Sequence, residues 1–114
     1  EEYAACFASS ACENLHFNDN WRLWDDDMTV GSVHTIELLE LVYWLDRVSY
    51  DGWYALDIFP YRENGIRAAN ESIKWIQGLH DLLDKIGRQN IAAAIAQGDA
   101  MQISSLVRSA LLGN

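Results

Sequence analysis

Four polar residues of the chain have the types and the order that could bind a divalent metal ion. His16 lies in a segment where polar and apolar residues alternate, and Asp57 lies in a mostly apolar one. Between them, Asp25 and Asp27 belong to a run of three aspartates. On an extended loop this spacing lets both carboxylates turn to the same side. Carboxylates with one imidazole suit a hard or borderline divalent ion such as Mg, Mn or Co.

Each of these signals also has an ordinary structural explanation. A polar residue within a strand more often makes a structural hydrogen bond than binds a metal ion. A run of aspartates is more often a solvated loop or a helix cap. For Asp26, His34 and His80 we expect surface positions without a role as ligands. Neither signal alone supports a function. The choice between a metal site and a structural role therefore depends on the elements that position these residues and on their order along the chain.

Two predicted strands carry His16 and Asp57. The alternation over residues 14–18 predicts one strand, and the apolar run 53–59, which ends at Pro60, predicts a strand buried on both faces of a parallel sheet. Residues 19–31 have no regular period and predict a long loop, which in compact domains is usually functional. Both polar residues then lie near the carboxyl ends of strands, where parallel α/β folds place their sites.

Most other segments predict helices. Apolar residues recur at intervals of three and four over residues 33–48, with Ser32 as the expected N-cap. Similar patterns cover residues 1–12, 66–86, 89–96 and 99–112, and we expect Trp44, Trp53 and Trp75 in the core. The alternation of helices and strands predicts an α/β fold with a parallel sheet. Two strands do not make a complete sheet, so we expect a larger α/β unit or strands from a partner.

Composition excludes several classes of function. The 114 residues suffice for one ordinary domain, and a net charge of −9 would repel nucleic acid. No apolar run approaches the roughly 18 to 20 residues of a membrane span, so no membrane partner is expected. We interpret Cys6 and Cys12 as free thiols rather than a disulfide. A reducing, cytoplasmic location follows from that interpretation.

The order of the polar residues resembles one enzyme family. Residues 16–19, HFND, and 25–33, DDDMTVGSV, are similar to the seventh strand and following loop of the xylose isomerase-like barrels, closest to the L-rhamnose isomerase branch. Residues 50–52, YDG, and 56–60, LDIFP, resemble the eighth strand. The resemblance implies a partial (β/α)₈ TIM barrel, units seven and eight, over residues 1–87. Residues 88–114 would then form an additional C-terminal helical extension.

The resemblance also implies roles for individual residues. His16 and Asp57 would bind a first, structural metal ion, and Asp25 and Asp27 a second, catalytic one. In the family, that second ion acts as a Lewis acid while a hydride moves between C1 and C2 of an open-chain sugar. Trp21 and Trp24 flank the aspartates, and we expect them to contact the sugar, with packing in a core or interface as the alternative.

The chain lacks the rest of the family's machinery. The remaining ligands, the catalytic lysine and the ring-opening histidine lie on the first six strands, and a whole barrel needs about 250 residues. We therefore assign no catalytic residue. The expected function is a fragment of an Mn-, Mg- or Co-dependent aldose–ketose isomerase that is inactive alone and binds its metal weakly or not at all. Because the chain does not begin with Met, we expect further sequence upstream.

A second hypothesis is a stand-alone, non-catalytic oligomeric module derived from the barrel. Unpaired edges of the strands at 14–18 and 53–59 would drive self-association, and a twofold dimer is the commonest form. DNA-repair endonucleases share this barrel superfamily, but the charge of −9 and the isomerase-type acidic loop disfavour them.

Overall fold

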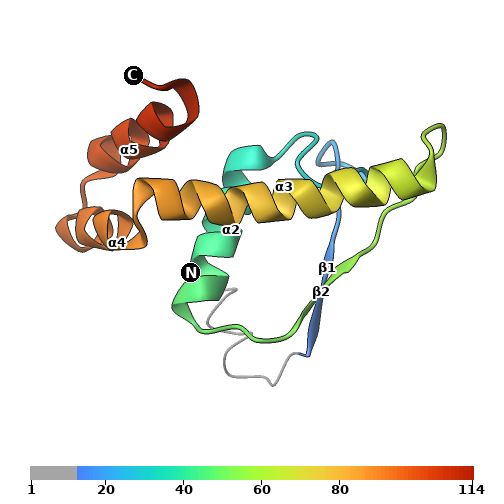
Figure 1. The fold of residues 1–114 in the computed structure, drawn as a ribbon, viewed down its shortest axis with the longest axis horizontal. Helices are drawn as coiled ribbons and strands as arrows, with labels where there is room; N and C mark the ends of the chain where they lie inside the picture. The colour runs from blue at the N-terminus through green and yellow to red at the C-terminus, as the bar shows by residue number, and fades with distance from the viewer. Residues whose placement is uncertain (1–12) are drawn as a thin grey trace.

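The structure, a computed structural model, describes residues 13–114 (Figure 1). Within that range the elements follow in the order β1 (Asn14–Phe17), α2 (Thr35–Arg47), β2 (Trp53–Leu56), α3 (Gly65–Ile86), α4 (Arg88–Gln97) and α5 (Ala100–Leu112). The four helices and two strands predicted for this part of the chain are present, and both strands are shorter than predicted. The predicted helix over residues 1–12 and the thiols of Cys6 and Cys12 lie outside the described residues.

The two strands form a parallel pair. His16 lies opposite Ala55 and Phe17 opposite Leu56, and α2 provides the crossover that parallel strands require. The rings of Phe17 and Tyr54 stack with centroids 4.9 Å apart on the face that packs against the helices. Because side chains alternate along a strand, His16 lies on the opposite, solvent-facing side.

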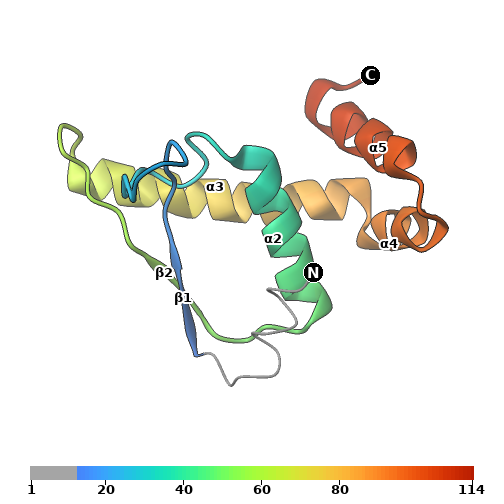
Figure 2. The same cartoon turned by 180° about the vertical axis from the view of Figure 1, so that it is seen from behind.

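Helix α3 organises the rest of the molecule. It runs along the long axis, with the strands and α2 to one side and α4 and α5 at its C-terminal end (Figures 1 and 2). Its N-cap is Asn64, whose side chain accepts a hydrogen bond from the Arg67 N–H at 3.1 Å. The buried core joins β1, α2, α3 and α4 through Phe17, Val30, Val42, Leu45, Leu79, Leu83, Ile86 and Ile91. None of the helices within residues 13–114 is both long and apolar enough to cross a membrane.

The predicted fold class, an α/β partial (β/α)₈ TIM barrel made of units seven and eight, is wrong. Residues 13–114 form four helices and a two-stranded parallel sheet, so the structure is mostly helical and contains no evident barrel units. In this part of the chain β1 and β2 pair only with each other, whereas a barrel strand has a neighbour on each side. The sheet is therefore small, and the helices supply most of the core.

The burial of β2 also differs from the prediction. The strand is not buried on both faces, and Trp53 at its start is 78% exposed. Trp53 shares the open face of the sheet with His16, and no helix of residues 13–114 covers that face. Trp44 is half-buried against the core, and Trp75 is 37% exposed. Of the three tryptophans expected in the core, Trp44 comes closest to that expectation.

Candidate functional site

His16 and Asp57 lie side by side at the carboxyl end of the strand pair. Asp57 follows β2 directly, and its N–H donates to the carbonyl oxygen of Phe17 at 3.0 Å, which aligns the two strand ends. The Nδ1 atom of His16 is 3.2 Å from Oδ2 of Asp57. Both side chains are more than half exposed, at 62% and 58%. The pair is accessible from solvent on the open face of the sheet.

The loop over residues 19–31, which we call the acidic loop, is closed by its own backbone. Two hydrogen bonds join Asp19 and Met28, with N···O distances of 3.0 and 2.8 Å. Within the loop, the side-chain amide of Asn18 donates to Oδ1 of Asp25 at 3.2 Å and to Oδ1 of Asp27 at 3.1 Å. One amide therefore holds both carboxylates on the same side of the loop.

The loop and the strand end meet. The N–H of Phe59 donates to the backbone oxygen of Asp27 at 2.8 Å, which ties the loop to the segment after β2. Partial burial and the negative charges of Asp25 and Asp57 raise the pKa of Asp27, against the hydrogen bond from Asn18, which lowers it. The structure thus places the His16–Asp57 pair and the Asp25 and Asp27 side chains at the same end of the strand pair, and we call these four residues the acidic cluster.

The acidic cluster does not fit a metal ion by itself. Its oxygen and imidazole donors suit Mg, Mn or Co chemically. However, no three His, Cys, Asp or Glu side chains in the described part of the chain converge as they would have to around one ion. His16 points to Asp57, while Asp25 and Asp27 share the amide of Asn18. Further donors, from outside residues 13–114, would be needed to complete such a site.

A shallow pocket adjoins the acidic cluster. Its volume is about 180 Å³, and it lies between the acidic loop and residues 58–63, with Asp27 and Phe59 among its lining. The rings of Phe59 and Tyr61 are 4.8 Å apart and both are exposed. An aromatic wall beside carboxylates is a surface on which a polyhydroxylated molecule can both stack and donate hydrogen bonds.

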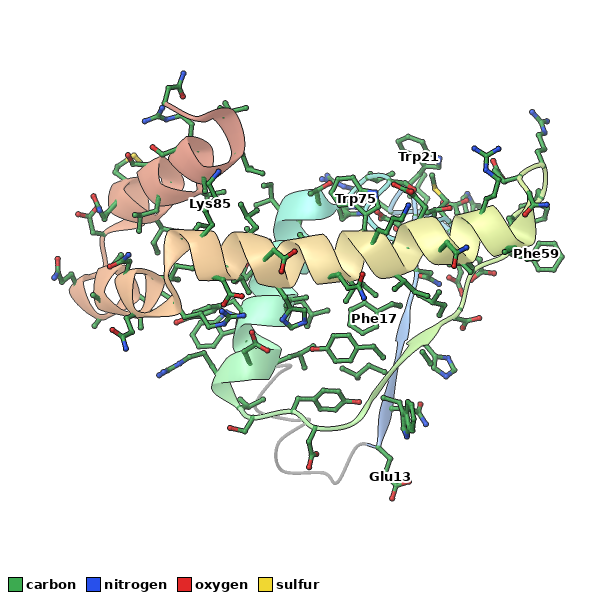
Figure 3. The ribbon with its side chains drawn as sticks, viewed as in Figure 1. Glu13, Phe17, Trp21, Phe59, Trp75 and Lys85 are labelled. Carbon is green, nitrogen blue, oxygen red and sulfur yellow. The ribbon has the colours of Figure 1, made fainter. Side chains whose placement is uncertain are left out.

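Trp21 and Trp24 are exposed rather than packed in the core of this chain. Their exposed fractions are 65% and 78%, and Figure 3 shows Trp21 at the outer edge of the molecule while Phe17 points inward. Asp26 is half-buried, and its Oδ2 accepts a solvent-exposed hydrogen bond from the Trp21 N–H at 2.7 Å. Asp26 therefore shapes the loop from which both tryptophans project.

Sequence reasoning missed Asp19, the buried carboxylate of this region. Its exposed fraction is 2%, and its Oδ2 accepts from the N–H groups of Val33 and His34 at 2.7 and 3.0 Å, just before α2. Oδ1 accepts from the Asn20 N–H at 2.9 Å and lies 2.7 Å from Nδ1 of His34. Asp19 thus connects the acidic loop to the start of α2.

This contact corrects two predictions. Ser32 is not the N-cap, because α2 begins after His34 and the free amides there bond to Asp19. His34 is not a surface histidine, since only 19% of its side chain is exposed. A loop carboxylate competes well for helix N-terminal amides because the charge strengthens each hydrogen bond.

The other histidine left out of the predicted site, His80, is also engaged. Its Nδ1 is 3.5 Å from Oδ2 of Asp46, and its ring stacks on Tyr54 with centroids 6.1 Å apart. Arg88 pairs with the same carboxylate at 2.9 Å. Burial and the nearby Asp46 charge raise the pKa of Tyr54 to about 12. These contacts link α2, α3 and α4 and lie apart from the acidic cluster.

No family model matches the chain, and no curated protein matches it either. The functional argument therefore depends on the geometry of the acidic cluster and its surroundings.

Replacing Asp27 with Asn is expected to raise the melting temperature at pH 7. The raised pKa of Asp27 means that the folded chain holds its proton more tightly than the unfolded chain does, so ionisation of Asp27 disfavours the fold as the pH rises. Asn keeps an oxygen for the Asn18 amide and tolerates the φ of +49° at this position. Thermal melts at pH 7 and pH 3 test this, because the gain should vanish when Asp27 is protonated.

Asp51→Asn is the matched control, since it removes one exposed charge outside the acidic cluster. It should raise the melting temperature less than Asp27→Asn does. Equal gains would attribute the effect to the net charge of −9 and not to repulsion within the cluster.

Proposed function

We propose that the chain contributes part of the ligand set of a divalent-metal-dependent aldose–ketose isomerase centre and has no such activity alone. One observation carries the proposal, namely the meeting of the His16–Asp57 pair with Asp25 and Asp27 at the carboxyl end of two parallel strands. Residues far apart in the sequence supply these groups. Their donor types are those that bind Mg, Mn or Co.

The charge state of the acidic cluster supports this proposal. Burial and then the negative charges of Asp25 and Asp57 raise the pKa of Asp27, and a divalent cation would offset those charges. Carboxylates held in this way, at a cost to the fold, are typical of functional sites. Since no three donors of residues 13–114 converge, the missing ligands and the proton-transfer groups would come from outside this range.

The surroundings of the cluster suit a sugar. Trp21 and Trp24 present exposed aromatic faces next to the acidic loop, and the pocket at Phe59 opens beside Asp27. Aromatic faces pack on the C–H surfaces of sugars, while carboxylates accept their hydroxyl hydrogens. The sugar would therefore be the substrate of the complete centre. A cytoplasmic location is part of the same proposal.

A second candidate function is a non-catalytic oligomeric module. It is favoured by the large apolar side chains that residues 13–114 leave exposed, among them Leu23 at 84% and Trp53 at 78%. Exposed apolar groups of this kind are covered when copies associate. The two candidates differ in whether the acidic cluster binds a metal ion at all.

Titration of the chain with MnCl₂ is expected to give weak binding, with a Kd above about 10⁻⁴ M, because the ligand set is incomplete. Isothermal titration calorimetry, with the paramagnetic relaxation of water protons as a second readout, measures it. Binding should be lost in the double variant Asp25→Asn/Asp27→Asn, whose side chains keep the same size without charge.

The control is Asp81→Asn/Asp84→Asn on α3, which removes two charges away from the acidic cluster. This variant should bind Mn²⁺ as the unmodified chain does. If the Asp25→Asn/Asp27→Asn chain keeps its affinity, the metal lies elsewhere and the proposed ligand set is wrong. If no Mn²⁺ binds to any variant, the oligomeric module is the better description.

A further inference from the structure

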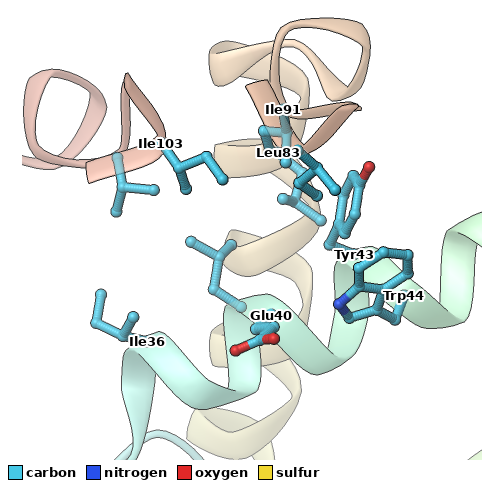
Figure 4. A pocket seen from close by; sticks show the side chains of 10 residues that line it. Ile36, Glu40, Tyr43, Trp44, Leu83, Ile91 and Ile103 are labelled. Atoms are coloured by element: carbon cyan, nitrogen blue, oxygen red, sulfur yellow. The ribbon is translucent and has the colours of Figure 1, made fainter. Parts of the chain in front are cut away.

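An apolar groove lies between helices α2 and α5. Its volume is about 330 Å³, which falls within the range of about 300 to 1,000 Å³ that is typical of small-molecule pockets. Figure 4 shows Ile36 on α2 across the open space from Ile103 on α5. The buried side chains of Leu83 and Ile91 close the groove on its inner side. The groove can therefore accept an apolar group that enters from solvent.

Glu40 is the charged side chain of this groove, and no other charged residue of the described part of the chain lines it. It lies in one row on α2 with Ile36 and Trp44, because side chains four positions apart share a helix face. Figure 4 shows Glu40 between these two side chains, with the indole nitrogen of Trp44 on the side of Glu40. The carboxylate is thus set into an apolar and aromatic surface.

Glu40 is also the acidic residue of α2 that has no partner in the described part of the chain. The carboxylate of Glu37 lies 4.0 Å from the guanidinium of Arg22, and that of Asp46 lies 2.9 Å from the guanidinium of Arg88. No such ion pair, and no hydrogen bond, involves the side chain of Glu40 there. Its charge is therefore balanced by solvent, which an occupant of the groove would displace.

This carboxylate determines which kind of ligand suits the groove. An apolar occupant would take Glu40 partly out of water, which is unfavourable unless a positive charge replaces the lost hydration. An anionic ligand would add repulsion, because no Lys, Arg or His of the described residues lines the groove. A positive charge beside Glu40 would also lie near Trp44, and cations are attracted to the face of an indole ring. The groove therefore favours an apolar tail with a cationic head.

We propose that the groove binds a small organic cation, namely an ammonium ion that carries an alkyl or arylalkyl tail. The tail fills the space between Ile36 and Ile103, and the ammonium group pairs with Glu40, whose side chain is exposed at the edge of the groove. This site is separate from the acidic cluster and needs no metal ion. Because the net charge of −9 attracts cations to the whole chain, the contribution of Glu40 must be separated from that of the overall charge.

Isothermal titration calorimetry of the full chain with probes that share an octyl tail tests the choice of head group. Octylammonium should bind with a Kd on the order of 10⁻⁴ M, and at least about tenfold more tightly than octanol or octanoate. Heteronuclear NMR locates the site, because the indole N–H signal that Trp44→Phe removes should shift as octylammonium is added to the unmodified chain.

Two substitutions on α2 test the pairing. Glu40→Gln should lower the affinity for octylammonium about tenfold and remove its preference over octanol. Ile36→Lys places a cation four positions before Glu40 and should remove the same preference, and Ile36 is 51% exposed, so the fold can accept the change. The matched control is Glu37→Gln, which removes the same charge from a residue outside the groove and should leave the preference unchanged. Thermal melts verify that each variant is folded.

Several results would overturn the proposal. Equal affinities for the probes would mean that the groove selects only the tail. Equal losses of octylammonium affinity in Glu40→Gln and Glu37→Gln would attribute binding to the net charge of −9. Binding that only Asp25→Asn/Asp27→Asn abolishes would place the cation at the acidic cluster. A chain that binds none of the probes also contradicts the proposal, and its sedimentation as a dimer would show that a second copy covers the groove.

Discussion

Replacing Asp19 with Asn is expected to lower the free energy of unfolding by about 3 kcal/mol. The carboxylate is 2% exposed and accepts hydrogen bonds from three backbone N–H groups, and it also lies 2.7 Å from the His34 ring nitrogen. Asn has the same shape but only one oxygen. The NH₂ group of Asn would therefore face the backbone N–H groups that bond to one oxygen of Asp19, and these donors would stay buried without an acceptor. Urea unfolding at pH 7 measures the loss.

The matched control is Asp26→Asn in the same loop. Asp26 also accepts a backbone hydrogen bond, from the Trp21 N–H at 2.7 Å, but the bond is exposed to solvent. Water can replace an exposed partner, so we expect a loss below about 1 kcal/mol. If the two variants lose similar free energies of unfolding, then burial and the connection to α2 do not make Asp19 more important for stability than Asp26.

The pH dependence of the Asp19 effect has a definite sign. Burial alone would raise the pKa of Asp19, but hydrogen bonds from Val33, His34 and Asn20 outweigh it and hold the pKa below the ordinary 3.8. The ionised group therefore stabilises the fold at every pH above its pKa in the unfolded chain, and this contribution is lost as the pH falls through the lowered value. The difference between Asp19→Asn and the unmodified chain should shrink below pH 3.8.

Asp19 also shows what the sequence could not predict. Apolar periodicity located each helix of residues 13–114 within a few positions, because a helix that buries one face needs that spacing. The cap of α2 depends instead on a residue fourteen positions before Val33. Nothing in the local pattern around Ser32 reveals that partner. Long-range polar contacts follow from the packing of loops, which the spacing of apolar residues does not encode.

The prediction of the fold class was wrong for a related reason. Strand patterns at β1 and β2 are real, and the strands pair in parallel. The number of strands beside them is a property of the whole sheet, and two strands are consistent with many architectures. In residues 13–114 the long helix α3 and its contacts with α2, α4 and α5 dominate instead. The order of His16, Asp25, Asp27 and Asp57 was more informative, since their grouping needs only the local pairing of two strand ends and one closed loop.

Gly31 is the position where a single added methyl group should cost most. Its φ is +83°, a conformation that side chains with a Cβ rarely adopt. A Cβ there would lie 2.6 and 2.8 Å from Cδ2 and Cγ of Trp75, well inside van der Waals contact. Gly31 follows Val30, whose N–H donates to the buried Ser72 hydroxyl at 3.2 Å, so the backbone cannot easily move away. Gly31→Ala should lower the free energy of unfolding by about 3 kcal/mol.

Two further variants separate the causes of that loss. Gly78 lies inside α3, where an added Cβ would meet nothing within 4 Å, so Gly78→Ala should stabilise the chain by about 0.5 to 1 kcal/mol. If the two Gly→Ala changes alter the free energy of unfolding in opposite directions, then the surroundings of each glycine, and not the residue type, determine the effect. In the double variant Gly31→Ala/Trp75→Ala the clash disappears but the positive φ remains, so part of the loss caused by Gly31→Ala should be relieved and part should persist. If Trp75→Ala relieves none of it, the ring does not restrict Gly31, and the backbone conformation alone excludes a side chain there.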